Sequence, residues 1–434
     1  MKRGFYTIMS AQFFSSLADN ALFVAAVELL RTEGAPEWQR AALVPMFALF
    51  YVILAPFVGA FADALPKGKV MFVSNAIKVV GCLMMLFGSH PLIAYAVVGL
   101  GAAAYSPAKY GILTELLPAS QLVKANGWIE GLTIASIILG VLLGGQLVGQ
   151  HLSGLLLGFD LPLIDTGVDT PAESAIAALI AVYAIAAWFN TRIPHTGVEM
   201  RPLRADPTRG VLANTLGQLP DFWACNARLW RDKLGQISLA TTTLFWGAGA
   251  NLKLIVLTWA GAALAYDTTQ ASALTGVVAV GTAVGAVVAS MRMRLDAATK
   301  VIPLGIGMGL LLILMVFIRD IWVAVPFLVL LGGLGGFLVV PMNALLQHRG
   351  HNLMGAGRSI AVQNFNENAC ILGLGAFYSL SLKLGLSVFG AITAFGLVVA
   401  GTMWIIRRWH QRNCVNHREE VNHLLHIARH DTHH

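Results

Sequence analysis

Acidic and basic side chains interrupt several of the longest apolar stretches in this sequence. Asp19, Lys253 and Glu367 each lie inside a long run of largely apolar residues. An ionised side chain at the centre of a bilayer costs about 2.5–3.5 kcal/mol on insertion scales, so it is retained where it faces an opposite charge or a wet cavity. Each of the three is therefore a candidate for substrate binding, proton binding or ion pairing.

Asp19 and Lys253 occupy equivalent places when the sequence is shifted by 234 residues against itself. We therefore expect them to face each other across two similar halves of the protein. Gln12, Ser15 and Ser16 extend a polar stripe along the helical face of Asp19. A purely structural ion pair is the alternative, and it is compatible with substrate binding.

The most polar part of any apolar stretch lies at residues 363–368. Gln363 and Glu367 are one helical turn apart and share a face, and Asn364 lies beside them. A surface that faces lipid would not carry these side chains, so we expect them to line the interior. For the amides, hydrogen bonding between helices is an equally good explanation.

Lys109 follows Pro107, which frees a backbone carbonyl and reshapes its helix. Glu130 is predicted at a similar depth and could pair with Lys109. The simpler alternative is that the side chain of Lys109 extends to the headgroups of the inner leaflet. The predicted cavity then offers charges of both signs: Lys109, Lys253, Arg358, Asp19, Glu130 and Glu367. This combination suits a zwitterion or a phosphate-bearing amphiphile better than a plain sugar.

The elements that must position these charges are apolar stretches of about twenty residues, the length needed to cross hydrocarbon. Apolar residues make up 57% of the chain and charged residues 12%. The stretches do not alternate as barrel strands do, so we expect an all-α membrane protein. Its transmembrane helices, about twelve in number, are predicted at residues 5–30, 40–62, 70–88, 91–115, 121–150, 173–192, 235–263, 270–291, 300–318, 322–347, 355–382 and 385–406.

The twelve stretches fall into two sets of six. We expect an N-terminal half at 1–192, a cytoplasmic linker with an interfacial helix at 193–234, a C-terminal half at 235–408 and a cytoplasmic histidine-rich tail at 409–434. The shift that aligns Asp19 with Lys253 also aligns Pro107 with Pro341. This repeat predicts two pseudo-symmetric halves around a central site, the architecture of major facilitator transporters.

Basic residues gather in alternate loops, which predicts the cytoplasmic side. These loops carry Lys67, Lys69, Lys124, Arg201, Arg204, Arg209, Arg292, Arg294, Arg349, Arg407 and Arg408. Both termini are then cytoplasmic, and we expect no cleavable signal before the first span. The net charge of +7 has this topological meaning, so nucleic acid is not an expected partner.

The segment from Gly59 to Lys69 is similar to the major facilitator motif between spans two and three. Asp63 near a helix end, followed by Lys67, could latch neighbouring helices during gating. Lys124, in the next basic loop, is assigned to the same latch. Positive-inside charge alone would explain the lysines but not Asp63.

Metal and cofactor sites are not expected. The four cysteines are scattered singly. One helical face of the tail carries His423, His426 and His430, but unshielded tail histidines bind metals adventitiously. The spacing of His426 and Asp431 matches a motif of lipid acyltransferases, but no acyltransferase domain surrounds it. The chain also carries no phosphate loop of the Gly-x-x-x-x-Gly-Lys type.

Five segments together resemble the family of bacterial lysophospholipid transporters. They are LADNAL at 17–22, AYSPAKYGIL at 104–113, LVKANG at 122–127, FWGAG at 245–249 and AVQN at 361–364. The resemblance runs from the first span to the last and ends near Arg408.

The resemblance implies facilitated flipping of lysophosphatidylethanolamine, and of lysophosphatidylglycerol, from the outer to the inner leaflet of the bacterial inner membrane. It implies a monomer that interacts with membrane lipids and is functionally coupled to a separate acyltransferase/acyl-carrier-protein synthetase. Asp19, Lys109, Lys253 and Glu367 fall on the family's functional charged positions. Lys253 stands where relatives carry arginine, which keeps the charge but removes the bidentate fork.

Three alternatives remain open from the residues: a proton-coupled exporter of amphipathic drugs, a facilitator of a small zwitterion, and a membrane sensor that moves nothing. An exporter would use Asp19 or Glu367 as its protonation site and would depend on the proton gradient.

Overall fold

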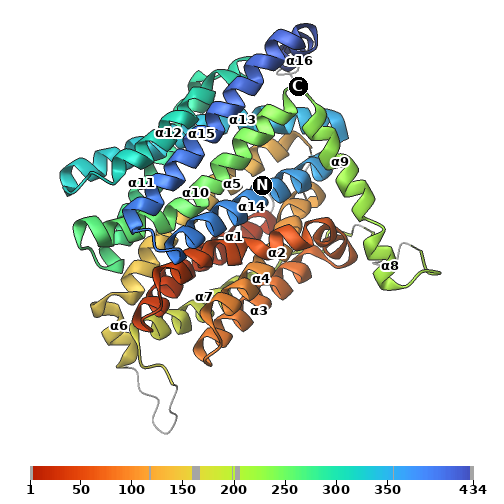
Figure 1. Cartoon of the computed structure of the whole chain (residues 1–434). Helices are drawn as coiled ribbons and strands as arrows, with labels where there is room; N and C mark the ends of the chain where they lie inside the picture. The colour runs from red at the N-terminus through yellow and green to blue at the C-terminus, as the bar shows by residue number, and fades with distance from the viewer. Residues whose placement is uncertain are drawn as a thin grey trace. The chain divides into compact units, whose positions relative to one another are not determined.

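The computed structural model describes residues 3–116, 119–158, 167–197, 199–200, 206–354 and 356–430, and within these residues the regular structure is helical (Figure 1). In chain order the helices are α1 (Arg3–Thr32), α2 (Glu37–Ala64), α3 (Lys67–Leu86), α4 (Pro91–Leu116), α5 (Ala119–Val148), α6 (Gln150–Leu157), α7 (Pro171–Thr191), α8 (Val211–Leu216), α9 (Leu219–Arg231), α10 (Gly235–Leu264), α11 (Thr268–Arg292), the 3-10 helix η1 (Leu295–Val301), α12 (Ile302–Met315), α13 (Ile321–Met354), α14 (Ala356–Lys383), α15 (Val388–Asn416) and α16 (Arg418–His430).

Long apolar helices dominate the described part of the chain. Eleven of its helical segments are long and apolar enough to cross a membrane. Helix α14, of 28 residues, is not among them, because it carries the polar run at residues 363–368. With α14 the long helices correspond one by one to the twelve predicted spans, and the all-α membrane fold is confirmed.

The helices divide into two compact units. The first unit comprises Met1–Gln218 and Tyr266–Gly276, and the second comprises Leu219–Ala265 and Val277–His434. The segment predicted as a linker is thus shared, because α9 packs with α10, α13 and α14 of the second unit. The first residues of α11 belong to the first unit.

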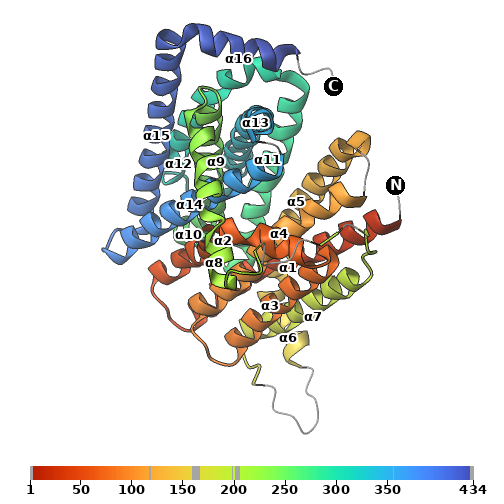
Figure 2. The same cartoon turned by 90° about the vertical axis from the view of Figure 1, so that its right-hand side faces the viewer.

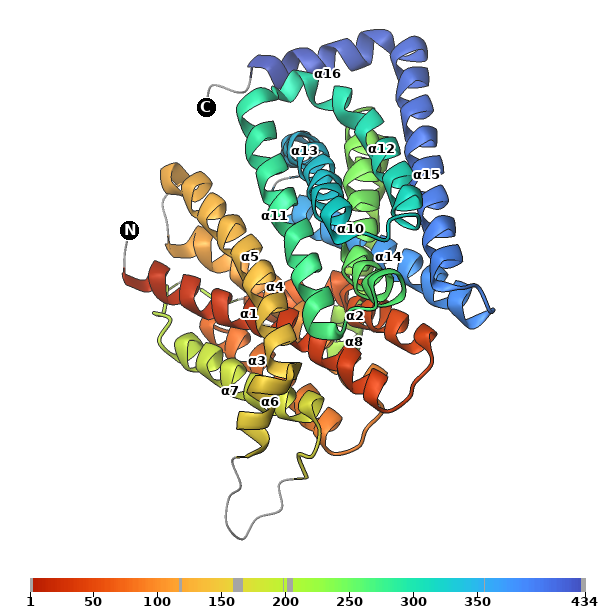
Figure 3. The same ribbon diagram turned by 90° about the vertical axis from the view of Figure 1, so that its left-hand side faces the viewer.

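In the first unit, α1 packs against α5 and α7, and α3 packs against α4 and α7 (Figure 3). Helices α1 and α5 approach closely at Gly140 and Gly144. A Cβ at Gly144 would lie 2.7 Å from the carbonyl oxygen of Ala21, and one at Gly140 would lie 2.7 Å from that of Leu17. Glycine permits this contact in lipid, where packing replaces the hydrophobic effect between helices.

In the second unit, α10 packs against α13 and α14, and α12 packs against α15 (Figure 2). The tail forms a folded helix: α16 packs on η1 and α15 and buries Val421, Leu424 and Ala428. Asp296 of η1 lies 3.9 Å from Arg429 of α16. His433 and His434 of the predicted histidine-rich tail lie outside the described residues.

The glycine contact between α1 and α5 can be tested within one helix. Gly144→Ala should destabilise the protein by about 1–3 kcal/mol, because the added methyl group would clash with backbone atoms of α1, which cannot move without disturbing that helix. Gly131→Ala in α5 is the matched control, since its Cβ would meet nothing within 4 Å. We expect this control to be neutral or stabilising by up to about 1 kcal/mol through helix propensity. Denaturant titration of the purified protein in detergent gives both values, and equal stability of the two variants would contradict the packing interpretation.

Candidate functional site

Asp19 is the acceptor at the centre of a buried network in the first unit. Lys78 of α3 donates a hydrogen bond from Nζ to Oδ2 of Asp19 at 2.8 Å, and the Tyr183 hydroxyl of α7 donates to Oδ1 at 2.6 Å. The side chain of Lys78 is 2% exposed and that of Asp19 is 20% exposed. The ion pair therefore joins three helices inside a region that excludes most water.

Lys78 has further partners around its ammonium group. Its Nζ donates to Oγ of Ser15 at 3.0 Å, and Ser15 donates to Oδ1 of Asn75 at 2.7 Å. The ammonium lies 5.1 Å from the ring centroid of Tyr105 and 5.7 Å from that of Tyr183. Two acceptors and two aromatic faces thus compensate for the desolvation of this cation.

Gly101 of α4 makes room for the aliphatic stem of Lys78. A Cβ at Gly101 would lie 2.8 Å from Cγ of Lys78 and 2.6 Å from the carbonyl oxygen of Ser74. In the described part of the chain, Nδ2 of Asn75 and the hydroxyl of Tyr105 are buried without a hydrogen-bond partner. Both groups adjoin the ion pair, so this network has unused capacity for a polar ligand.

The sequence pointed to Asp19 and its polar stripe but missed Lys78 and Tyr183. Lys78 lies inside the predicted span 70–88, so the cost of burying a charge in a span marks it in the same way as Lys253. Lys253 lies in α10 of the second unit, where it is partly buried, and its predicted pairing with Asp19 stays a prediction.

In the second unit, Gln363 and Glu367 of α14 are hydrogen-bonded to each other. Nε2 of Gln363 lies 2.7 Å from Oε1 of Glu367 and 2.6 Å from Oδ1 of Asn343 in α13. The side chains of Gln363 and Glu367 are buried, whereas Asn364 is partly buried. This cluster joins α13 to α14 and places a carboxylate in the interior of the second unit.

Helix α9 attaches to the other side of this polar run through Asn366. Oδ1 of Asn366 accepts from Nε1 of Trp230 at 3.1 Å, and Nδ2 donates to Asn226 at 2.8 Å. Arg358 lies near the start of α14 and 3.7 Å from Asp221 of α9, with both side chains more than half exposed. Exposed pairs of this kind contribute little to stability.

A second buried ion pair, which the sequence did not single out, fixes the beginning of α10. Arg349 of α13 lies 2.6 Å from Asp232, and both side chains are less than 9% exposed. Asp232 also accepts from the backbone amide of Gly235 at 2.7 Å. The pattern of basic loops predicts only a topological role for Arg349 and does not identify Asp232 as its partner.

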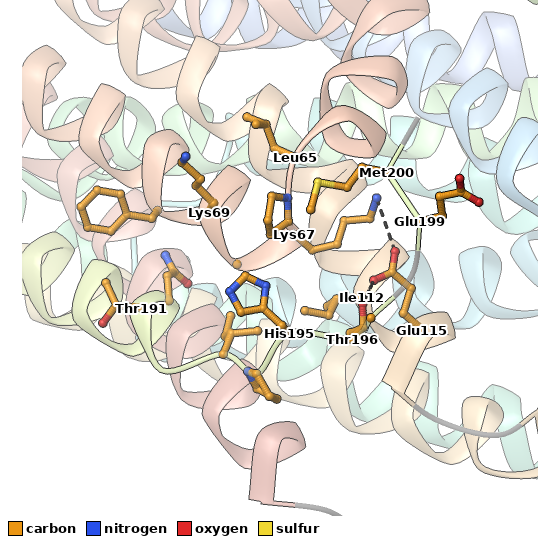
Figure 4. Close-up of a pocket in the computed structure, with 17 residues that line it drawn as sticks. Leu65, Lys67, Lys69, Ile112, Glu115, Thr191, His195, Thr196, Glu199 and Met200 are labelled. Carbon is orange, nitrogen blue, oxygen red and sulfur yellow. Dashed lines mark hydrogen bonds and ion pairs between the residues drawn. The ribbon is translucent and has the colours of Figure 1, made fainter. Parts of the chain in front are cut away.

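Of the predicted latch residues, the structure describes the side chain of Lys67. Lys67 donates to the carbonyl oxygen of Ala62 at 2.8 Å and lies 3.5 Å from Glu115 of α4 (Figure 4). It thereby connects the end of α2, the start of α3 and the end of α4. The side chains of Asp63, Lys124 and Glu130 lie outside the described residues, so their predicted roles stay predictions. Lys109 lies in α4 and is partly buried.

A family model of the Major Facilitator Superfamily matches residues 8–373. The chain therefore belongs to the Major Facilitator Superfamily, and it is a multi-pass membrane transporter rather than an enzyme.

Individual relatives narrow the class. The chain is 40% identical over 394 residues to the Lysophospholipid transporter LplT of Yersinia enterocolitica serotype O:8 / biotype 1B, and the match covers 89% of each chain. It is 39% identical, with the same coverage, to the protein of that name from Yersinia pestis (strain Pestoides F). Within the superfamily it is thus a member of the lysophospholipid transporter family.

Solved structures support the fold. A mutant of the nucleoside transporter NupG superposes with a TM-score of 0.66 at 12% identity, covering 94% of this chain and 99% of that one. A bacterial homologue of the human lysosomal transporter Spinster, in an inward-facing unoccupied conformation, gives a TM-score of 0.58 at 17% identity. The superposition covers 99% of this chain and 96% of that one.

The network around Asp19 predicts a strong, non-additive effect on stability. Lys78→Met should destabilise the protein by about 3–5 kcal/mol, because it leaves the carboxylate of Asp19 buried without its cation. Adding Asp19→Asn should recover part of this loss, since the unpaired charge is then removed. Lys300→Met, at an exposed lysine of η1, is the control and should be nearly neutral. Unfolding in detergent provides the comparison, and equal losses for Lys78→Met and Lys300→Met would rule out a stabilising pair.

Proposed function

We propose that this protein facilitates the flipping of lysophosphatidylethanolamine, and of lysophosphatidylglycerol, from the outer to the inner leaflet of the bacterial inner membrane. The observation that carries the proposal is the similarity, over 89% of the chain, to curated lysophospholipid transporters. A separate acyltransferase/acyl-carrier-protein synthetase on the cytoplasmic side would then restore the second acyl chain. The basic loops support a topology with both termini in the cytoplasm, and we propose that the transporter acts as a monomer.

The Asp19–Lys78 pair suggests how a zwitterionic headgroup is accommodated. The phosphate would take Lys78 from Asp19, and the ethanolamine ammonium would take the place of Lys78 beside Asp19. One pair of opposite charges is then exchanged for two, so no charge is left buried alone. Opening a buried pair costs several kcal/mol, which charge-assisted hydrogen bonds to the headgroup would offset.

We assign Lys109, Lys253 and Glu367 to the same pathway. Lys109 and Lys253 would contact the phosphate at successive stages, while Glu367, held by Gln363, would take the ammonium or close the gate. The single acyl chain would remain in lipid through a lateral opening, so that it never crosses water. Alternating access by rocking of the two halves would complete the step, driven by reacylation on the inner side.

Uptake and reacylation of fluorescent lysophosphatidylethanolamine test the proposal. The host is a spheroplast that lacks its native transporter but retains the acyltransferase, and expression is checked for every variant. Asp19→Ala, Lys78→Ala and Lys253→Ala should each lower the rate about 10- to 150-fold, the equivalent of one hydrogen bond to a charged group, about 1.5–3 kcal/mol. Asp169→Ala, at an exposed aspartate before α7, is the matched control and should transport normally.

The same assay separates the alternatives. Uptake that persists after an uncoupler collapses the proton gradient supports facilitated flipping, whereas uptake that stops favours a proton-coupled transporter. A wild-type rate equal to that of the empty vector, with expression confirmed, would overturn lysophospholipid transport and leave the drug exporter, the small-zwitterion facilitator and the sensor.

A further inference from the structure

A cleft of about 580 Å³ lies in the first unit, at a place that the Asp19 network does not reach (Figure 4). Its walls come from the turn between α2 and α3, the start of α3, the end of α4, and the end of α7 with the segment that follows it. The loops that border it carry lysines on the predicted cytoplasmic side. None of the functions assigned above uses this cleft as a binding site.

The start of α3 gives the cleft the character of an anion site. The helix begins at Lys67 after Pro66, with no side-chain cap and no acidic residue in its first turn. Its first hydrogen bonds run from the amides of Lys69 and Val70 to the carbonyl of Pro66. Lys67 is paired with Glu115, and the exposed Lys69 adds its positive charge to the partial positive charge of the helix end, an arrangement that a bound anion stabilises.

A buried amide supplies the second, independent observation. Asn190, at the end of α7, lines the cleft and is 2% exposed. Among the described residues, neither its Oδ1 nor its Nδ2 has a hydrogen-bond partner. Each buried polar group that stays unpaired costs about 1–3 kcal/mol, so a ligand that reaches Asn190 would recover this free energy.

The other residues that line the cleft favour a zwitterionic amphiphile over a simple anion. Glu115 is already engaged by Lys67 and by the hydroxyl of Thr196, which donates to it at 2.7 Å. Glu199 also lines the cleft and is exposed, so it can receive an ammonium group. The apolar side chains of Leu65, Phe72 and Met200 complete the wall and suit the first methylene groups of an acyl chain.

We propose that this cleft binds the headgroup of an inner-leaflet phosphatidylethanolamine. The phosphate contacts Lys69, the first amides of α3 and Asn190, and the ammonium contacts Glu199. The site is distinct from the Asp19 network, and the inference does not depend on which substrate the protein transports.

Protection of a cysteine from a maleimide measures occupancy at equilibrium. Met200→Cys places the thiol in the cleft at a residue that is 50% exposed, and Leu212→Cys in α8 is the control, at a residue that is 73% exposed and outside the cleft. The full chain in detergent is titrated with dioctanoyl phosphatidylethanolamine, dioctanoyl phosphatidylglycerol or inorganic phosphate. At about ten times Kd, occupancy of about nine-tenths should slow labelling of Met200→Cys about tenfold and leave Leu212→Cys unchanged.

Added substitutions identify the contacts. Lys69→Gln or Asn190→Leu, combined with Met200→Cys, should abolish the protection by phosphatidylethanolamine, whereas Lys300→Gln, which removes a lysine charge elsewhere, should preserve it. Glu199→Gln should remove the preference for phosphatidylethanolamine over phosphatidylglycerol. Melting temperatures of all variants exclude misfolding.

Absence of protection in a folded Met200→Cys protein, or equal protection by inorganic phosphate, would overturn the proposal. Because labelling involves no translocation, its failure is distinguishable from a failure of lysophospholipid uptake.

Discussion

The first unit depends on one constraint: a lysine and an aspartate of opposite charge must be held together in a largely buried place. The pair alone would not meet the cost of dehydrating two charges. The hydroxyls of Ser15 and Tyr183 and the ring of Tyr105 supply the remaining compensation. This requirement fixes the register of α1, α3 and α7 relative to one another, and it explains why α4 carries glycine at position 101.

The second unit also buries charged side chains, but it compensates for their desolvation with different partners. Its interior carboxylate, Glu367, is held by an amide, and its buried arginine, Arg349, is paired with Asp232 at the start of α10. Amides can exchange partners at a lower cost than ions, because they carry no net charge to desolvate. The polar face of α14 can thus be rearranged at a lower cost than the Asp19–Lys78 ion pair.

The fold could be predicted closely because lipid imposes a simple rule: each span is a continuous apolar run that satisfies its own backbone. The site could be predicted only in part. The cost of burial marks Asp19 and Glu367, but the choice of Lys78 as partner depends on how α1 and α3 pack, which hydropathy does not encode. The cleft beside Asn190 depends on segments far apart in sequence. Helix α16 could have been predicted from the sequence, since Val421, Leu424 and Ala428 recur at helical spacing among its three histidines.

The neutrality of the Asp19–Lys78 pair has a consequence for energetics. A membrane potential acts on net charge, at about 2.3 kcal/mol per elementary charge per 100 mV. If this pair binds the substrate as we propose, the two charges of the site cancel and the two charges of an ethanolamine headgroup also cancel, so the voltage acts on no net charge. Movement of a phosphatidylethanolamine-type lysolipid would then be electrically silent, whereas a phosphatidylglycerol-type lysolipid would carry its negative charge against the inside-negative potential of a bacterial cell. The same protein would therefore accumulate the two lipids to different extents in an energised membrane.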